Sequence, residues 1–489
     1  MTTKSLKLKA LKGTVWNAFN VLIVQGINVV FGIILARILM PSDYGLIGML
    51  AIFIAISQLF IEGGFRTALI QKNNCSNADY STVFYFNLVA AVFLYLVLFF
   101  SAPLIAKFYH TLELERLTQV LSLNLIINSL SIVQQARLYI KLNFKAYALA
   151  SFLSVVISAP LGLILAYRGF GAWALVIQSL SYSLVRTFFL FYFDRWLPLL
   201  IFRGVSFKQL FGFSFKLLGA GLISTTMSNI YSVLIGRKFA AKDLGFYTTA
   251  RRYPDLLATT VTNILQDTNF SVLTSVRNEK ARMISIYERL MSMTVFFVMP
   301  IMVLFALLAD PFVHIFLTDK WAPVVPLLQW LCFCRIITTI SIFNISIVNV
   351  IGRSDLYLKI EIFKVFVIMG GLILTIPLGL KAVVIGYFVV IVICFFINAY
   401  YPGKLFGYGV IRQIKEMKYI VYATLVMVLS FFVAQIFLPT GFMELLVCIP
   451  LCIIVYLAAS YLFKIKELNE VFNMLRLIVS KLKELSVST

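Results

Sequence analysis

Cationic side chains recur inside, or at the ends of, long apolar stretches of this 489-residue chain. The candidates for ligand binding are Arg37, Arg66, Lys216, Arg237, Arg251, Arg252 and Arg335. Fewer carboxylates share these stretches, namely Glu62, Asp255 and Asp267. A charge within hydrocarbon costs about 2.5–3.5 kcal/mol even on a lenient scale, so an excess of cations indicates a hydrated site. Arginine in such a site suits phosphate, because its planar fork bonds two oxygens at once.

Snorkelling to the membrane interface is the alternative explanation for cations near the ends of the apolar stretches. Arg335 sits deeper in its stretch, where snorkelling is harder. Glu62 and Arg66 are one helical turn apart and are expected to pair, which still leaves several cations without carboxylates. The alternative applies to Arg37, Arg66, Arg137, Lys141 and Lys216.

Polar side chains form stripes on several of the apolar stretches. At 100° per residue each stripe lies on one helical face, so striped helices can together enclose a hydrated cavity. Hydrogen bonding between neighbouring helices is the alternative. The candidate polar lining consists of Asn17, Asn28, Asn124, Asn128, Gln135 and Asn349.

Signatures of enzymes, cofactors and metals do not stand out. There is no Walker Gly-x-x-x-x-Gly-Lys, no His-Glu-x-x-His and no Gly-x-Ser-x-Gly sequence. Two histidines and six cysteines without a Cys-x-x-Cys pair argue against a metal site. We therefore expect neither catalytic residues nor a cofactor.

The elements that must position the candidate residues are membrane helices. Hydrophobic residues make up 61% of the chain and charged residues only 13%, whereas soluble chains carry about 25% charged residues. A membrane helix needs roughly 20 apolar residues. The pattern predicts an all-α polytopic protein with 14 spans, near 14–38, 45–69, 82–107, 117–140, 146–167, 171–193, 209–236, 245–270, 285–309, 322–350, 357–377, 382–401, 418–438 and 441–463.

The formal net charge is +22, from 42 Lys and Arg against 20 Asp and Glu. We attribute it mainly to basic loops on the cytoplasmic side rather than to nucleic acid, which favours cytoplasmic N- and C-termini. Cations at 237, 238, 242, 251 and 252 fall on the outer side of this topology. Either the topology is wrong there or these residues line a cavity.

An internal repeat divides the chain. The segment 36–45 (ARILMPSDYG) matches 236–245 (GRKFAAKDLG), and weaker matches follow in the same order. Six spans in each half imply parallel repeats with a substrate site between them. We predict an N-lobe over 1–200, a C-lobe over 201–405, two extra helices over 406–463 and an amphipathic tail over 464–489. The tail suits the membrane interface, or a partner protein.

Asp43 and Asp243 occupy equivalent places in this repeat. An aspartate in a turn before a glycine, here two residues before it, is ordinary turn chemistry, which we favour over a gating role.

Five segments resemble bacterial polysaccharide exporters: 35–46 (LARILMPSDYGL), 68–72 (ALIQK), 169–176 (GFGAWALV), 352–359 (GRSDLYLK) and 398–405 (NAYYPGKL). Together they are similar to Wzx-type lipid-linked oligosaccharide flippases of the multidrug/oligosaccharidyl-lipid/polysaccharide superfamily. The resemblance covers about residues 5–420. It implies two six-helix lobes in a V shape around a cationic lumen in a bacterial inner membrane.

The resemblance also implies a substrate, an undecaprenyl-pyrophosphate-linked oligosaccharide that moves to the periplasmic leaflet. Coupling to a H⁺ or Na⁺ gradient would involve the lumen acids. A polymerase and a chain-length regulator of the same pathway are possible partners, besides membrane lipids. The alternative is a cation-coupled multidrug exporter of the same superfamily, although the excess of cations disfavours it. A membrane glycosyltransferase, polymerase or ligase is disfavoured by the short loops.

Overall fold

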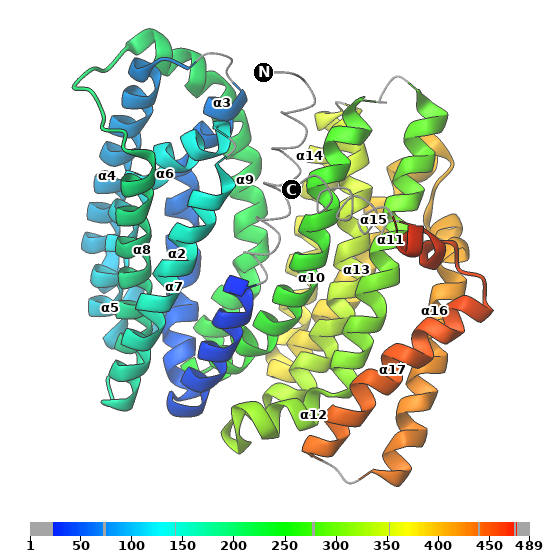
Figure 1. The fold of residues 1–489 in the computed structure, drawn as a ribbon. Coiled ribbons are helices and arrows are strands. Elements are labelled where there is room, and N and C mark those ends of the chain that lie inside the picture. The colour runs from blue at the N-terminus through cyan, green and yellow to red at the C-terminus, as the bar shows by residue number, and fades with distance from the viewer. Residues whose placement is uncertain are drawn as a thin grey trace, which may run out of the picture. The chain divides into compact units, whose positions relative to one another are not determined.

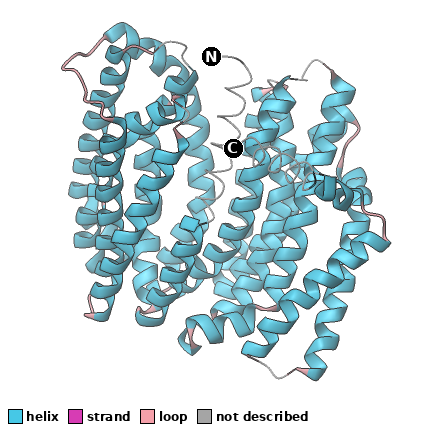
Figure 2. Ribbon diagram, viewed as in Figure 1, coloured by secondary structure: helices cyan, strands magenta, loops and turns pink. Residues whose placement is uncertain are grey.

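Helices and loops make up the described part of the protein, in which there is no β-strand (Figure 2). The computed structural model describes residues 23–71, 75–141, 143–275, 279–351, 353–438, 441–473 and 476. An α-helix bonds its backbone polar groups internally, which is what a hydrocarbon environment demands. The predicted all-α class is therefore confirmed for these residues.

The chain divides into two compact units, Met1–Thr248 (unit 1) and Thr249–Thr489 (unit 2). Unit 1 holds a helix over Ile23–Ile38 and the helices α2 to α9, which run from blue to green in Figure 1. Their bounds are α2 Pro41–Glu62, α3 Phe65–Gln71, α4 Asn77–Tyr109, α5 Glu113–Leu121, α6 Leu123–Ile140, α7 Phe144–Tyr167, α8 Ala172–Asp194 and α9 Gly204–Lys238.

Helix α10 (Ala241–Ser275) begins in unit 1 and continues into unit 2. The rest of unit 2 comprises α11 Lys280–Leu307, α12 Ala309–Phe312, α13 Val324–Val350, α14 Ser354–Thr375, α15 Leu380–Phe406, α16 Val410–Phe437 and α17 Phe442–Leu462. A π-turn (Val313–Leu317) and 3₁₀ turns (Asp319–Trp321 and Ile376–Leu378) interrupt this series. A short helical stretch over 466–473 follows α17.

Local sequence explains where the helices of unit 1 break. Gly63 and Gly64 have φ values of +48° and +76°, a conformation that glycine adopts without strain, and they end α2 at Glu62. Asn143 caps α7, because its Oδ1 accepts a hydrogen bond from the Ala146 N–H at 3.2 Å. These breaks direct α3 towards α6 and α7 towards α8, and the pair α7 and α8 packs most extensively.

Eleven helices in the described part are long and apolar enough to cross a membrane, from α2 to α17. Three predicted spans are not among them. The span predicted at 14–38 is described only from residue 23, while α9 and α10 are long helices in which the side chains of many residues lie outside the described part. The count of 14 therefore stays a prediction, and so do the predicted lobe boundaries.

The surfaces of both units carry large apolar side chains. Phe100 on α4 is 73% exposed and Phe437 on α16 is 80% exposed. Only 22% of the apolar window of α4 is buried within the protein. Apolar surface of this extent suits contact with lipid rather than water.

Candidate functional site

Two cations surround one buried carboxylate at one end of unit 1. The Asp194 side chain on α8 has no exposed surface, and it accepts hydrogen bonds from Arg137 Nε at 2.6 Å and Lys141 Nζ at 2.5 Å. The Arg137 guanidinium also lies over the rings of Tyr80 and Trp196, 4.9 and 5.2 Å from their centroids. This cluster ties α6 to α8 and to the loop beyond α8, so its cations have structural partners.

A second group of side chains lies at the same end of α6 and α8. Arg66 on α3 lies over the ring of Tyr139, 4.8 Å from its centroid, and the Tyr139 and Tyr147 rings meet edge to face at 5.2 Å. Arg186 on α8 donates a hydrogen bond from Nη2 to the Tyr147 hydroxyl at 2.7 Å and lies 5.3 Å from that ring's centroid. We call Arg66, Tyr139, Tyr147 and Arg186 the dibasic tyrosine cluster.

The expected pairing of Glu62 with Arg66 does not form. Gly63 and Gly64 end α2 between the two residues, so they do not share one helix. Glu62 instead accepts a hydrogen bond from Gln58 Nε2 at 3.0 Å. The helical i, i+4 rule fails here because the glycines redirect the chain.

The polar stripe of α6 faces α8 at two positions. Asn124 Nδ2 donates to Ser179 Oγ at 3.2 Å, and Gln135 Oε1 lies 3.5 Å from Arg186 Nη2. Asn128 is half-buried. These contacts are hydrogen bonds between helices, which was the alternative interpretation of the stripe for Asn124 and Gln135.

The repeat-related segments near residues 40 and 240 have the same local structure. The Asp43 carboxylate accepts a hydrogen bond from the Met40 N–H at 2.8 Å, and Asp243 accepts one from the Ala240 N–H at 3.3 Å. Both aspartates therefore stabilise helix starts, as turn chemistry predicts. Arg237, just before the second of these turns, is half-buried and lies 5.2 Å from the centroid of the Phe108 ring.

In unit 2, three candidate residues come together. Asp255 on α10 pairs with Arg335 on α13 in a short contact and with Arg251, one turn away on its own helix, at 3.3 Å. Their side chains are between 22% and 29% exposed. Two guanidinium groups and one carboxylate leave the group with a net positive charge.

The remaining candidates are placed as follows. Arg37 is exposed, whereas Asn28 and Arg252 are half-buried. Asn17 lies outside the described residues, as do the side chains of Lys216, Asp267 and Asn349.

Sequence reasoning missed a buried polar network in unit 2. The Tyr287 hydroxyl donates to Asn344 Oδ1 at 2.5 Å, and Asn344 exchanges hydrogen bonds with Gln413 at 3.2 and 2.8 Å. Gln413 also donates to the Tyr408 carbonyl at 3.0 Å. Isolated amides within apolar helices are the sequence signal that points to such a network, which here joins α11, α13 and α16.

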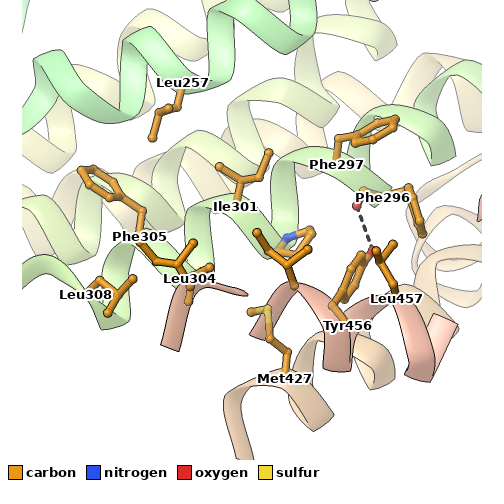
Figure 3. A pocket seen from close by; sticks show the side chains of 13 residues that line it. Leu257, Phe296, Phe297, Ile301, Leu304, Phe305, Leu308, Met427, Tyr456 and Leu457 are labelled. Carbon is orange, nitrogen blue, oxygen red and sulfur yellow. Dashed lines mark hydrogen bonds between the residues drawn. The ribbon is translucent and has the colours of Figure 1, made fainter. Parts of the chain in front are cut away.

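An apolar pocket of about 490 Å³ lies within unit 2 (Figure 3). Its walls come from α10, α11, α16 and α17, and its only internal hydrogen bond drawn in Figure 3 runs from the Tyr456 hydroxyl to the Phe296 carbonyl at 2.8 Å. The lining residues are Leu257, Phe296, Phe297, Pro300, Ile301, Leu304, Phe305, Leu308, Met427, Ile449, Ile453, Tyr456 and Leu457. None of these described lining residues is charged, so the pocket suits hydrocarbon and not an anionic head group.

In the described part of the chain, no group of three or more His, Cys, Asp or Glu side chains is arranged so that it could hold a metal ion. The site's chemistry there rests on guanidinium, hydroxyl and amide groups. Guanidinium, hydroxyl and amide groups can all donate hydrogen bonds to an anion.

Comparisons with known proteins agree on a family. A family model described as "Polysaccharide biosynthesis protein" matches residues 34–326. The teichuronic acid biosynthesis protein TuaB of Bacillus subtilis is 24% identical over 357 residues, which cover 72% of this chain and 73% of that protein. The lipopolysaccharide biosynthesis protein WzxC of Escherichia coli is 21% identical over 372 residues, covering 76% of each. The resemblance to Wzx-type exporters is thereby confirmed.

A solved structure of similar fold is that of the lipid II flippase MurJ in an inward closed conformation. It matches with a TM-score of 0.72, covering 94% of this chain and 99% of that one. The sequence identity is 14%, so this likeness establishes the fold alone.

Proposed function

The chain belongs to the polysaccharide biosynthesis protein family, and we propose that it flips a polyprenyl-diphosphate-linked oligosaccharide across the bacterial inner membrane. The head group would move from the cytoplasmic to the periplasmic leaflet. The observation that carries this proposal is the presence, in the described structure, of two arginines without a carboxylate partner, Arg186 on the candidate membrane span α8 and Arg66 on the short helix α3. Within the described part of the chain, neither Arg66 nor Arg186 forms an ion pair.

An anionic, sugar-bearing head needs a hydrated and positively charged passage, because bare charge in hydrocarbon is costly. In our proposal the polyprenyl tail stays in lipid while the head passes through that passage. Repeat-related halves that alternate between two arrangements would expose the head first to one side and then to the other. The cations proposed to contact the head are Arg37, Arg66, Lys216, Arg237, Arg251, Arg252 and Arg335.

The acids of the passage have a separate proposed role. Asp255 is held by Arg251 and Arg335, so a proton or sodium ion that binds there would have to compete with two guanidinium groups. When the ion binds Asp255, the displaced arginine side chain would become available to bind the substrate. Ion binding would thereby couple the gradient to substrate binding. Glu62 and Asp267 are the other acids proposed for coupling.

Charge reversal tests the cationic passage. Arg251→Glu and Arg335→Glu are expected to abolish export of the glycan while each protein still inserts into the membrane. Because Arg335→Glu also brings two carboxylates together, the swap Asp255→Arg with Arg335→Asp serves as the control that keeps the pair. Wild-type export from both reversal variants would contradict the proposal.

A strain that lacks its own exporter distinguishes this function from drug extrusion. We expect the protein to restore surface glycan and to leave the efflux of cationic dyes unchanged. Dye extrusion without restored glycan would favour the multidrug alternative instead. In the proposed topology both termini are cytoplasmic, and the glycan polymerase and chain-length regulator of the same pathway are the proposed partners.

A further inference from the structure

We propose that the dibasic tyrosine cluster is a binding site for the diphosphate group of the lipid-linked substrate. This inference rests on the proposed function and deepens it. It adds Arg186, Tyr139 and Tyr147 to the substrate contacts, and it places a head-group site inside unit 1.

Continuous contacts hold two guanidinium groups around a pair of tyrosines. Arg66 lies against Tyr139, Tyr139 against Tyr147, and Tyr147 against Arg186. The four residues come from α3, α6, α7 and α8, so no single helix can move one of them without disturbing the others. Aromatic faces hold a guanidinium in one plane, which lowers the entropy lost when it binds a ligand.

In the described structure neither Arg66 nor Arg186 has a carboxylate partner, whereas the nearby cations Arg137 and Lys141 share Asp194. Asp194 is the carboxylate on α8 closest in sequence to Arg186, and it is already occupied by Arg137 and Lys141. In the described structure Arg186 contacts neutral acceptors, the Tyr147 hydroxyl and the Gln135 amide oxygen. Its Nε is buried and has no hydrogen-bond partner there, which leaves a donor for a ligand.

The composition of the cluster fits a diphosphate better than a carboxylate or a neutral sugar. Two guanidinium groups match the charge of a diphosphate and each offers paired donors to phosphate oxygens. Tyrosine hydroxyls add donors that carry no charge. The side chains of Arg66, Tyr139, Tyr147 and Arg186 are all partly exposed, so a ligand can approach them.

The position of the cluster along the helices fits entry from the cytoplasmic leaflet. Tyr139 lies near the end of α6, Tyr147 near the start of α7 and Arg66 just beyond the end of α2. In the proposed topology these ends face the cytoplasm. A lipid-linked diphosphate lies at this depth before it is moved, because its tail stays in the hydrocarbon.

Binding of farnesyl diphosphate to the full-length protein in detergent tests the assignment. We expect Arg66→Gln and Arg186→Gln each to weaken the affinity by about tenfold or more, because each removes a charge-assisted pair of hydrogen bonds. Arg195→Gln, which removes an exposed arginine at the same end of α8, should change the affinity by less than about twofold. Farnesol, which lacks the diphosphate, should bind wild type and variants alike.

Two further measurements keep the test decisive. Arg186→Lys retains the charge and loses the paired N–H donors of the guanidinium. This variant should fold as wild type does and bind farnesyl diphosphate with intermediate affinity. Short-chain phosphatidylglycerol, a phosphate of ordinary bilayer lipid, should compete poorly. Equal and Arg186-dependent binding of that lipid would overturn the assignment to the substrate and indicate a site for bilayer head groups.

The failure of this inference differs from the failure of the proposed function. If reconstituted wild-type protein translocates the lipid-linked saccharide but the Gln variants bind farnesyl diphosphate normally, the site assignment is wrong and the function stands. If the variants lose binding but the wild-type protein translocates nothing, the diphosphate site stands and the function fails.

Discussion

Gly45 and Gly245 have reciprocal environments at the starts of two repeat-related helices. A Cβ added at Gly45 would lie 1.7 Å from the carbonyl oxygen of Ala241, the first residue of α10. A Cβ added at Gly245 would lie 1.7 Å from the carbonyl oxygen of Pro41, the first residue of α2. Each helix therefore packs directly against the backbone of the other, and glycine is required at both crossing points.

Substitution of either glycine by alanine should destabilise the protein, because the obstructing atoms are backbone and cannot rotate away. We expect Gly45→Ala and Gly245→Ala each to cost about 1–3 kcal/mol, seen as a lower thermal unfolding temperature in detergent. Gly370→Ala is the control, since Gly370 is a helical glycine with no atom within 4 Å of an added Cβ. Equal unfolding temperatures for all three variants would contradict the close packing of α2 against the start of α10.

Asp194 should stabilise unit 1. Asp194→Asn leaves the largely buried Arg137 and the half-exposed Lys141 without their shared carboxylate, which we expect to cost about 1–3 kcal/mol. The loss should appear as reduced monodisperse yield on size-exclusion chromatography. Asp319→Asn changes a carboxylate that is 91% exposed and should leave the yield unchanged. A normal yield of Asp194→Asn would mean that the cluster contributes little.

Asp255 should stabilise unit 2 through Arg335 and Arg251. We expect Asp255→Asn to cost about 1–3 kcal/mol of stability, because charge-assisted hydrogen bonds to both guanidinium groups are lost. The exposed pair of Arg353 and Asp355 provides the contrast, and Asp355→Asn should change the unfolding temperature little. Thermal unfolding of the purified variants measures both effects, and similar shifts would contradict the role given to Asp255.

The helical stretch after α17 should dock on α11 in a pH-dependent way. Burial raises the pKa of Glu467, so its contribution to stability is present below the ordinary glutamate pKa and is lost as pH rises through the raised value. Glu467→Gln should therefore raise the unfolding temperature at neutral pH, and the difference from wild type should shrink in acid.

Glu470→Gln is the matched control for that experiment, because Glu470 forms an ion pair with Arg289 on α11 at 2.7 Å. Loss of this partly exposed ion pair should lower the unfolding temperature slightly at neutral pH. A lower unfolding temperature for Glu467→Gln at neutral pH would contradict the docking described here.

Apolar length predicted the positions of the helices well, because each membrane helix must supply its own run of hydrocarbon-facing residues. The break between α2 and α3 was not predicted, although the pair Gly63–Gly64 signals it. Since the span was read as one helix, Arg66 was expected to pair with Glu62, whereas it lies over Tyr139. Periodicity alone does not reveal where a glycine pair redirects the chain.

A single sequence does not predict which residues far apart in the chain contact one another. Asp194 binds Arg137 and Lys141, which precede it by 57 and 53 residues, and nothing in the local pattern marks the three as partners. Arg186 is not among the candidates that the sequence indicated, because its tyrosine partner lies on another helix. The internal repeat was the exception, since matched spacing at 36–45 and 236–245 predicted matched local structure.

The sidedness of a lipid-linked oligosaccharide tests the proposed function most directly. We would reconstitute the full-length protein in liposomes with the labelled lipid and probe the outer leaflet with a membrane-impermeant glycan reagent. The account predicts that wild-type protein equilibrates the lipid between leaflets far faster than empty liposomes do, and that the double variant Arg66→Gln with Arg186→Gln is slower. Sidedness identical to that of empty liposomes, for a glycan that the native pathway makes, would contradict the central claim.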